Sequence, residues 1–206
     1  MVRPFPGDSL VADTSVDATK EVRLLQKALA GDGAAFATLV EPHLDLLYRI
    51  AGRAAGSAAL AEDAVQEALE IVHKRLGRYE AGTSFKAFIA SIAVRRARTL
   101  LRAELRRSRR ESATPDAAHP ATPAELFVAE ETAGRIRAAL AALPEKRQRV
   151  VLLRLDAGLG YAEIAAAVGT TEGSARVLVH HALRDLHETL SDLVNAPSAK
   201  PERTES

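Results

Sequence analysis

The chain has 206 residues, of which 47% are hydrophobic and 27% are charged, and its formal net charge at pH 7 is only +1. This composition excludes a wholly disordered chain, and no apolar run approaches the roughly 18 residues of a membrane span. The N-terminus lacks a secretory apolar core, so no signal peptide is expected. The absence of cysteine excludes disulfides and thiolate chemistry and favours a cytoplasmic protein. Sparse aromatic residues and abundant Ala, Leu, Arg and Glu predict an all-α fold.

The charge is unevenly distributed along the chain. Eight arginines and a single acid, Glu104, lie between residues 95 and 110, so the rest of the chain is net acidic. This polarity predicts a local site for a polyanion rather than a generally basic surface.

Nine prolines divide the chain and leave 43–114 and 145–196 free of helix breakers. We expect two small helical domains joined by a flexible linker, the second containing a helix-turn-helix. The expected ranges are a disordered tail 1–19, a helical domain 20–111, a linker 112–123, a second domain 124–195 and a disordered tail 196–206.

Helical spacing of apolar residues predicts individual helices inside both domains. The first domain is expected to hold helices over 20–30, 33–54, 59–76 and 83–110. The second is expected to hold helices over 124–142, 145–157, 161–168 and 172–193. Asp32 and Thr171 are expected N-caps, and Gly31 and Gly169 suit the left-handed turns that end helices.

The helix over 59–76 carries an acidic face. Asp63, Gln66, Glu67 and Glu70 follow one another at i, i+3, i+4 and i+7. From the spacing alone, this pattern fits either a solvated face near the positive end of the helix dipole or a docking surface for a basic partner.

The helix over 83–110 carries a row of arginines. Phe85, Phe88, Ile89, Ile92 and Ala93 fall on its expected core side. Arg95, Arg98, Arg102, Arg106 and Arg109 share an arc of about 80° away from that side. Such a row fits a phosphate backbone, whose oxygens guanidinium groups bind in bidentate fashion. A solvated basic face or a membrane-surface helix is the alternative. In the preceding loop, 77–84, Tyr79 offers a flat face on which a base could stack.

Residues 161–182 have the pattern of a helix-turn-helix, in which Ala165 allows two helices to cross closely. An ordinary helical hairpin is the alternative. The second helix would enter a major groove, and its candidate contacts are Glu172, Ser174, Arg176, His180 and Arg184. His180, Arg184 and His187 share a face but lack a third ligand, so no metal site is expected.

Four motifs, taken together with their order and spacing along the chain, resemble those of a known family. They are 61–67 (AEDAVQE), 85–93 (FKAFIASIA), 143–154 (LPEKRQRVVLLR) and 158–165 (GLGYAEIA). Together they resemble the extracytoplasmic-function (ECF) group of bacterial RNA polymerase sigma factors, which keep regions 2 and 4. Where this family usually has Trp in the second motif, the chain has Phe88.

The resemblance implies roles for the residues above. Asp63, Gln66, Glu67 and Glu70 would bind core RNA polymerase, and Tyr79 with Arg95, Arg98, Arg102, Arg106 and Arg109 would bind the minus-ten promoter element. Glu172, Ser174, Arg176, His180 and Arg184 would bind the minus-thirty-five element. The partners implied are core polymerase, duplex and single-stranded promoter DNA, and an anti-sigma protein.

Two other functions remain as alternatives. A stand-alone helix-turn-helix regulator would use its N-terminal domain as a sensor and would bind duplex DNA without polymerase. A nucleic-acid-processing enzyme would need clustered acids in a basic cleft. No nucleophile, metal or phosphate-loop motif is present, so neither an enzyme nor a cofactor is expected.

Overall fold

The computed structural model describes residues 14–79, 83–111 and 134–195. All regular elements of these residues are helices, which confirms the all-α prediction. The expected linker 112–123, the C-terminal tail 196–206, most of the N-terminal tail and residues 124–133 lie outside the described residues.

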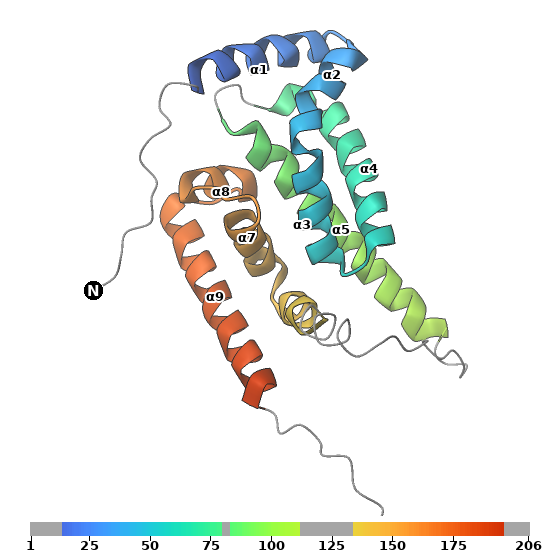
Figure 1. Cartoon of the computed structure of the whole chain (residues 1–206), viewed down its shortest axis with the longest axis vertical. Helices are drawn as coiled ribbons and strands as arrows, with labels where there is room; N and C mark the ends of the chain where they lie inside the picture. Colours follow the sequence, from blue (N-terminus) through green and yellow to red (C-terminus); the bar gives the residue numbers. More distant parts are fainter. Residues whose placement is uncertain (1–13, 80–82, 112–133, 196–206) are drawn as a thin grey trace, which may run out of the picture.

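The first domain is built from five α-helices and two short 3₁₀ turns (Figure 1). In chain order they are α1 (Thr14–Leu29), α2 (Gly33–Val40), η1 (Glu41–His43), α3 (Leu44–Ala55), α4 (Ala58–Arg75), η2 (Leu76–Arg78) and α5 (Phe85–Glu111). The helix α1 begins at Thr14, before the expected start at residue 20.

The prediction of one continuous helix over 33–54 is wrong. The helix stops at Val40, and the chain makes a 3₁₀ turn over Glu41–His43 before α3 begins. Pro42 is the physical reason, because it lacks the N–H that an uninterrupted helix needs and its ring clashes with the preceding turn.

The helices α3, α4 and α5 pack against one another, and α1 lies across one end of them (Figure 1). Ile50, Val65 and Ile89 bring one fully buried side chain from each of the three helices to the shared core. Fully buried alanines, such as Ala64 and Ala93, let the helix backbones approach closely. Of the apolar side predicted for the long helix, Phe85, Ile89 and Ala93 are buried in this core, and Phe88 and Ile92 pack against it partly buried.

The second domain contains helical residues 134–142, then α7 (Glu145–Leu155), α8 (Tyr161–Val168) and α9 (Glu172–Asn195). Gly169 ends α8 with φ +69°, and the Thr171 hydroxyl accepts a hydrogen bond from the Ser174 N–H at 3.2 Å. Ile164, Ala175 and Val179 are buried between α8 and α9. This geometry confirms the predicted helix-turn-helix.

The two domains are in direct contact. Helix α5 of the first domain packs against α7 and α8 of the second, and α3 also touches α7. Figure 1 shows α7 and α8 between α9 and the helices of the first domain. The sequence predicts two domains joined by a flexible linker but carries no local signal for this packing between them.

Candidate promoter and polymerase interfaces

The acidic face of α4 is on the surface as predicted. Asp63, Gln66 and Glu70 are exposed, whereas Val65 and Val72 of the same helix are fully buried. Glu67 is half-buried and forms an ion pair with Arg96 of α5. The pair holds the Glu67 carboxylate at the boundary between the two helices. Glu70 pairs with Lys74 of its own helix at 3.4 Å, so Asp63 is the more available acid of this face.

The predicted arginine row on α5 is interrupted. Arg95 and Arg106 are exposed, and Arg102 donates from Nη1 to Glu145 Oε2 of α7 at 2.8 Å. The helical position of Arg109 is described, but its side chain is outside the described part. Arg98 is only 7% exposed. The expectation of an unbroken solvent-facing row is therefore wrong at Arg98.

The second domain covers Arg98 and also supplies the acceptors for its hydrogen bonds. Its Nη1 donates to Gln148 Oε1 at 2.6 Å, and its Nη2 donates to the Leu143 carbonyl at 3.0 Å. Burial lowers the pKa of the Arg98 guanidinium, the neighbouring Arg102 lowers it further, and Glu145 opposes them. Gln148 itself is fully buried. A charged donor and a neutral amide acceptor thus join α5 to α7 in an interior where lost hydrogen bonds are costly.

A second polar contact joins the domains at the end of α7. Arg53 of α3 pairs with Asp156 Oδ1 at 3.2 Å, and Arg49 donates to the Asp156 carbonyl at 3.2 Å. The Asp156 side chain is 5% exposed. Its burial raises the pKa of the carboxyl group, while Arg53 and Arg49 act in the opposite direction.

Tyr79 does not offer an open face for a base in this arrangement, which corrects that expectation. Its side chain is 8% exposed and its ring packs edge-on against Phe85, with centroids 5.3 Å apart. The hydroxyl shares its one proton between two acceptors, the Thr83 carbonyl at 2.6 Å and the Glu21 carboxylate at 3.0 Å. Burial and the Glu21 carboxylate raise the pKa of Tyr79 to about 12. The residue holds the loop before α5 to α1.

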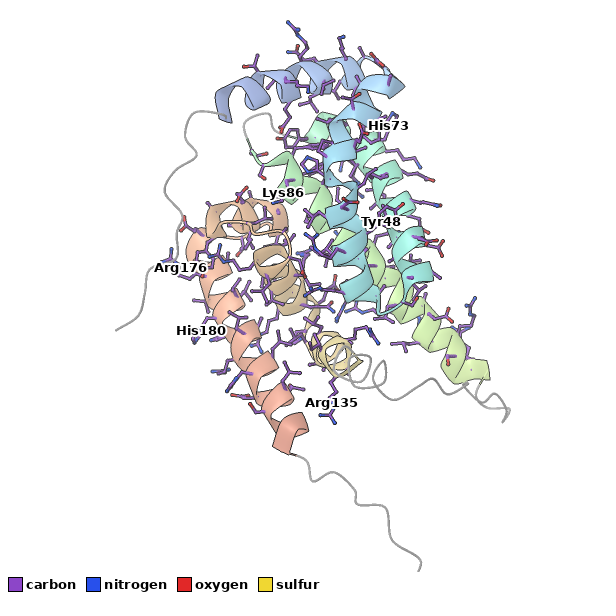
Figure 2. All side chains as sticks on the ribbon, viewed as in Figure 1. Tyr48, His73, Lys86, Arg135, Arg176 and His180 are labelled. Carbon is purple, nitrogen blue, oxygen red and sulfur yellow. The ribbon has the colours of Figure 1, made fainter. Side chains whose placement is uncertain are left out.

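The candidate contacts at the start of α9 are all on the surface. Glu172, Ser174, Arg176, His180 and Arg184 are exposed. Figure 2 shows Arg176 and His180 on the side of α9 that faces away from the first domain. The Arg176 guanidinium lies 5.1 Å from the centroid of the Tyr161 ring and pairs with Glu172 at 3.0 Å. These contacts hold a cation at the exposed face of α9.

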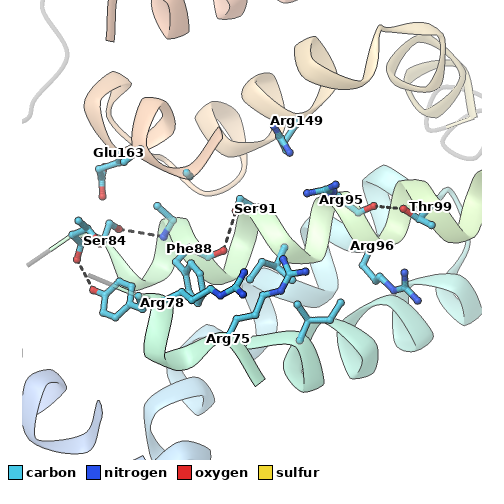
Figure 3. A pocket seen from close by; sticks show the side chains of 17 residues that line it. Arg75, Arg78, Ser84, Phe88, Ser91, Arg95, Arg96, Thr99, Arg149 and Glu163 are labelled. Atoms are coloured by element: carbon cyan, nitrogen blue, oxygen red, sulfur yellow. Dashed lines mark hydrogen bonds between the residues drawn. The ribbon is translucent and has the colours of Figure 1, made fainter. Parts of the chain in front are cut away.

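A basic cleft of about 690 Å³ lies between the domains. Arg75, Arg78, Arg95 and Arg96 line it from the first domain, and Arg149 and Glu163 line it from the second. In Figure 3 the Arg149 side chain points from α7 across the cleft toward α5. Sequence reasoning missed the roles of Gln148, Glu145 and Arg149, since no local pattern marks a residue whose partner lies in another domain.

Comparisons with known proteins agree with this architecture. The sigma-70 region 2 family matches residues 39–107, and the sigma-70 region 4 family matches residues 133–186. The RNA polymerase sigma factor CarQ of Myxococcus xanthus is 33% identical over 168 residues, which cover 79% of this chain and 94% of that protein. The ECF sigma factor SigD of Mycobacterium tuberculosis is 30% identical over 178 residues, which cover 81% of this chain and 82% of SigD.

Two solved structures share the fold. CnrH, in complex with the cytosolic domain of CnrY, matches with a TM-score of 0.62 at 21% identity and covers 87% of this chain and 99% of that chain. RpoE of Bartonella quintana, in complex with the anti-sigma factor NepR, matches with a TM-score of 0.53 at 22% identity. The match covers 75% of this chain and 98% of that chain.

The two-region architecture and these relatives define the class as the sigma-70 family. Within it, the chain belongs to the ECF group of RNA polymerase sigma factors, as the sequence motifs indicated. Sigma factors of this family are regulators of transcription initiation. No helix in the described part of the chain is long and apolar enough to cross a membrane.

Proposed function

We propose that this sigma factor binds core RNA polymerase through α4 and directs the polymerase to promoters that α5 and α9 recognise. The observation that best supports this proposal is that sigma-70 regions 2 and 4 both occur in this one chain. Each region also has a polar surface outside its own buried core. Such a protein acts in the cytoplasm, where the polymerase is, and performs no covalent chemistry itself.

Core binding is assigned to Asp63, Gln66, Glu67 and Glu70. Asp63 and Glu70 are exposed acids on one helix face. They suit a basic surface of the polymerase, because complementary charge accelerates association and fixes register.

Binding of the minus-ten element is assigned to Arg95, Arg98, Arg102, Arg106 and Arg109 of α5. Arg95 and Arg106 are accessible in the described arrangement, whereas Arg98 and Arg102 bind α7. Contact of Arg98 with DNA therefore requires α5 and α7 to separate. Tyr79 would reach a base only if its contacts with Glu21 and Phe85 also break.

Binding of the minus-thirty-five element is assigned to Glu172, Ser174, Arg176, His180 and Arg184 on α9. An exposed helix that follows a tight turn suits entry into a major groove. The complex of RpoE with the anti-sigma factor NepR supports the further proposal that an anti-sigma protein binds this chain.

Reconstituted transcription tests the proposal. The purified chain should bind purified core polymerase in a pull-down and should produce discrete run-off transcripts from genomic fragments. Core enzyme alone, on the same fragments, is the control. Tight binding of duplex promoter DNA without polymerase, together with no run-off product, would instead indicate a stand-alone helix-turn-helix regulator.

A further inference from the structure

The cleft between the domains contains an unbalanced group of positive charges. Arg75, Arg78 and Arg95 line it with no carboxylate partner among the described residues. Glu67 is paired with Arg96, so it does not offset these charges. Glu163 lines the cleft and accepts a hydrogen bond from the Gly160 N–H at 2.7 Å, and its single negative charge is outnumbered by the arginines.

The second domain contributes Arg149 to the positive charges that line the cleft. Its Nε is buried and has no hydrogen-bond partner. Burial lowers the pKa of the Arg149 guanidinium, Glu145 raises it, and Arg95, which faces it from α5, lowers it again. The Glu145 carboxylate is itself bound to Arg102. Arg95 and Arg149, which come from different domains, thus both line the cleft, and their like charges repel each other.

A guanidinium binds phosphate oxygens through paired, charge-assisted hydrogen bonds. Ser84, Ser91 and Thr99 also line the cleft. The hydroxyls of Ser91 and Thr99 donate to backbone carbonyls of α5, and that of Ser84 accepts from the Ala87 N–H. A volume of about 690 Å³ falls within the range typical of small-molecule sites.

We propose that the cleft between the domains binds a small ligand that carries two or more phosphate groups, held between Arg95 of α5 and Arg149 of α7. Since the ligand contacts both domains at once, its binding stabilises the packed arrangement in which Arg98 is buried. A bound ligand would therefore oppose the separation that promoter recognition requires.

Calorimetric titration of the full chain with inorganic tripolyphosphate, at constant ionic strength, tests this site. The wild type should bind, and Arg149→Gln should weaken binding about tenfold or more, because it removes one charged partner. Lys146→Gln is the matched control, as it removes the same charge from an exposed position on α7 outside the cleft. It should change affinity by less than about twofold, the small effect expected of a screened surface charge.

Two further titrations, one with a second variant and one with a second ligand, complete the test. Arg95→Gln alters an exposed residue of the opposite wall of the cleft and should weaken the binding of tripolyphosphate as Arg149→Gln does. This variant tests the site even if the Arg149 variant folds poorly. ATP should bind with the same dependence on Arg149, since the recognised group is the polyphosphate. Equal effects of Arg149→Gln and Lys146→Gln, or no binding by the wild type, would overturn the proposal.

A short oligothymidylate, titrated in parallel, separates a ligand site from a strand-binding groove. Its affinity should depend far less on Arg149 than that of tripolyphosphate does, and an equal loss would overturn the proposal. These titrations use neither polymerase nor promoter. Their failure would leave the sigma-factor function standing, and failure of run-off transcription would leave the anion site standing.

Discussion

Arg98 and Gln148 meet across the domain boundary, 50 residues apart in sequence, with Nη1 of Arg98 2.6 Å from Oε1 of Gln148. The arginine belongs to the helix assigned to promoter binding, and the glutamine is fully buried in the second domain. Under the proposed function, the same guanidinium would have two competing partners, the interior of the protein and DNA. Such a competition would link the packing of the domains to promoter recognition.

Replacing Gln148 by Leu should destabilise the protein. The substitution removes the acceptor of a buried cation, and an unsatisfied buried donor costs about 1–3 kcal/mol. Denaturant unfolding should show a lower free energy of unfolding by this amount. Gln26→Leu, at an exposed position of α1, is the control and should change it by less than about 0.5 kcal/mol. Equal effects of the two variants would contradict the burial of the Arg98 contact.

The turn of the helix-turn-helix depends on a backbone conformation that only glycine adopts easily. Gly169 has φ +69°, and an added Cβ would meet no atom within 4 Å, so any cost of Gly169→Ala comes from the backbone alone. We expect a loss of about 1 kcal/mol in the free energy of unfolding.

Gly173→Ala, four residues later inside α9, is the matched control. Its Cβ would also meet open space, and its φ lies outside the left-handed region. Alanine favours helix there and should stabilise the protein by about 0.5–1 kcal/mol. Thermal unfolding that moves in the same direction for both variants would contradict this description of the turn.

Tyr79 should titrate later than an ordinary tyrosine. Its pKa is raised to about 12 by burial and by Glu21, so the fold favours the protonated phenol. The stability from this group is present below the ordinary value of about 10 and is lost as the pH rises through about 12. An ultraviolet titration of tyrosinate should show a late component that Tyr79→Phe removes.

Tyr48→Phe provides the control for this titration, because Tyr48 is 43% exposed. The late component should persist in that variant. If Tyr79→Phe instead removes only absorbance that rises near pH 10, the ring is solvated and the buried contacts with Glu21 and Thr83 are incorrect.

Charge reversal on the acidic face should weaken core binding. Asp63→Arg places a cation where a basic partner surface is proposed, and like charges across an interface are strongly unfavourable. Titration of labelled chain with core polymerase should show a loss of about tenfold or more in affinity. Asp45→Arg makes the same reversal at an exposed position on α3 and should leave the affinity within about twofold, as expected outside an interface. Similar losses in both variants would remove the assignment of α4 as the docking face.

Local sequence signals were sufficient for much of the fold. The bounds of α8, Tyr161–Val168, agree with the expected helix 161–168, and Asp32 caps α2 by accepting from the Ala35 N–H at 3.0 Å. Capping and helical periodicity depend on residues three or four positions apart, which a sequence displays directly.

The candidate site was harder to predict, because its contacts span long sequence separations. Tyr79 is held by Glu21, 58 residues away, and an aromatic residue in a glycine-containing loop is compatible with either burial or exposure. Helical periodicity placed Arg98 on the outer side of α5. That side is indeed outside the core of the first domain, but the second domain covers it.

The salt dependence of promoter binding tests the central proposal most directly, namely that arginines of α5 bind the phosphate backbone of promoter DNA. Arg106 is exposed and pairs with no carboxylate in the described residues, so Arg106→Ala removes a phosphate contact without breaking an internal one. For the holoenzyme on its promoter, the slope of log affinity against log salt should become shallower by about 0.7–0.9. Arg23→Ala, exposed on α1, should leave the slope unchanged. An unchanged slope in Arg106→Ala would contradict the proposed role of α5.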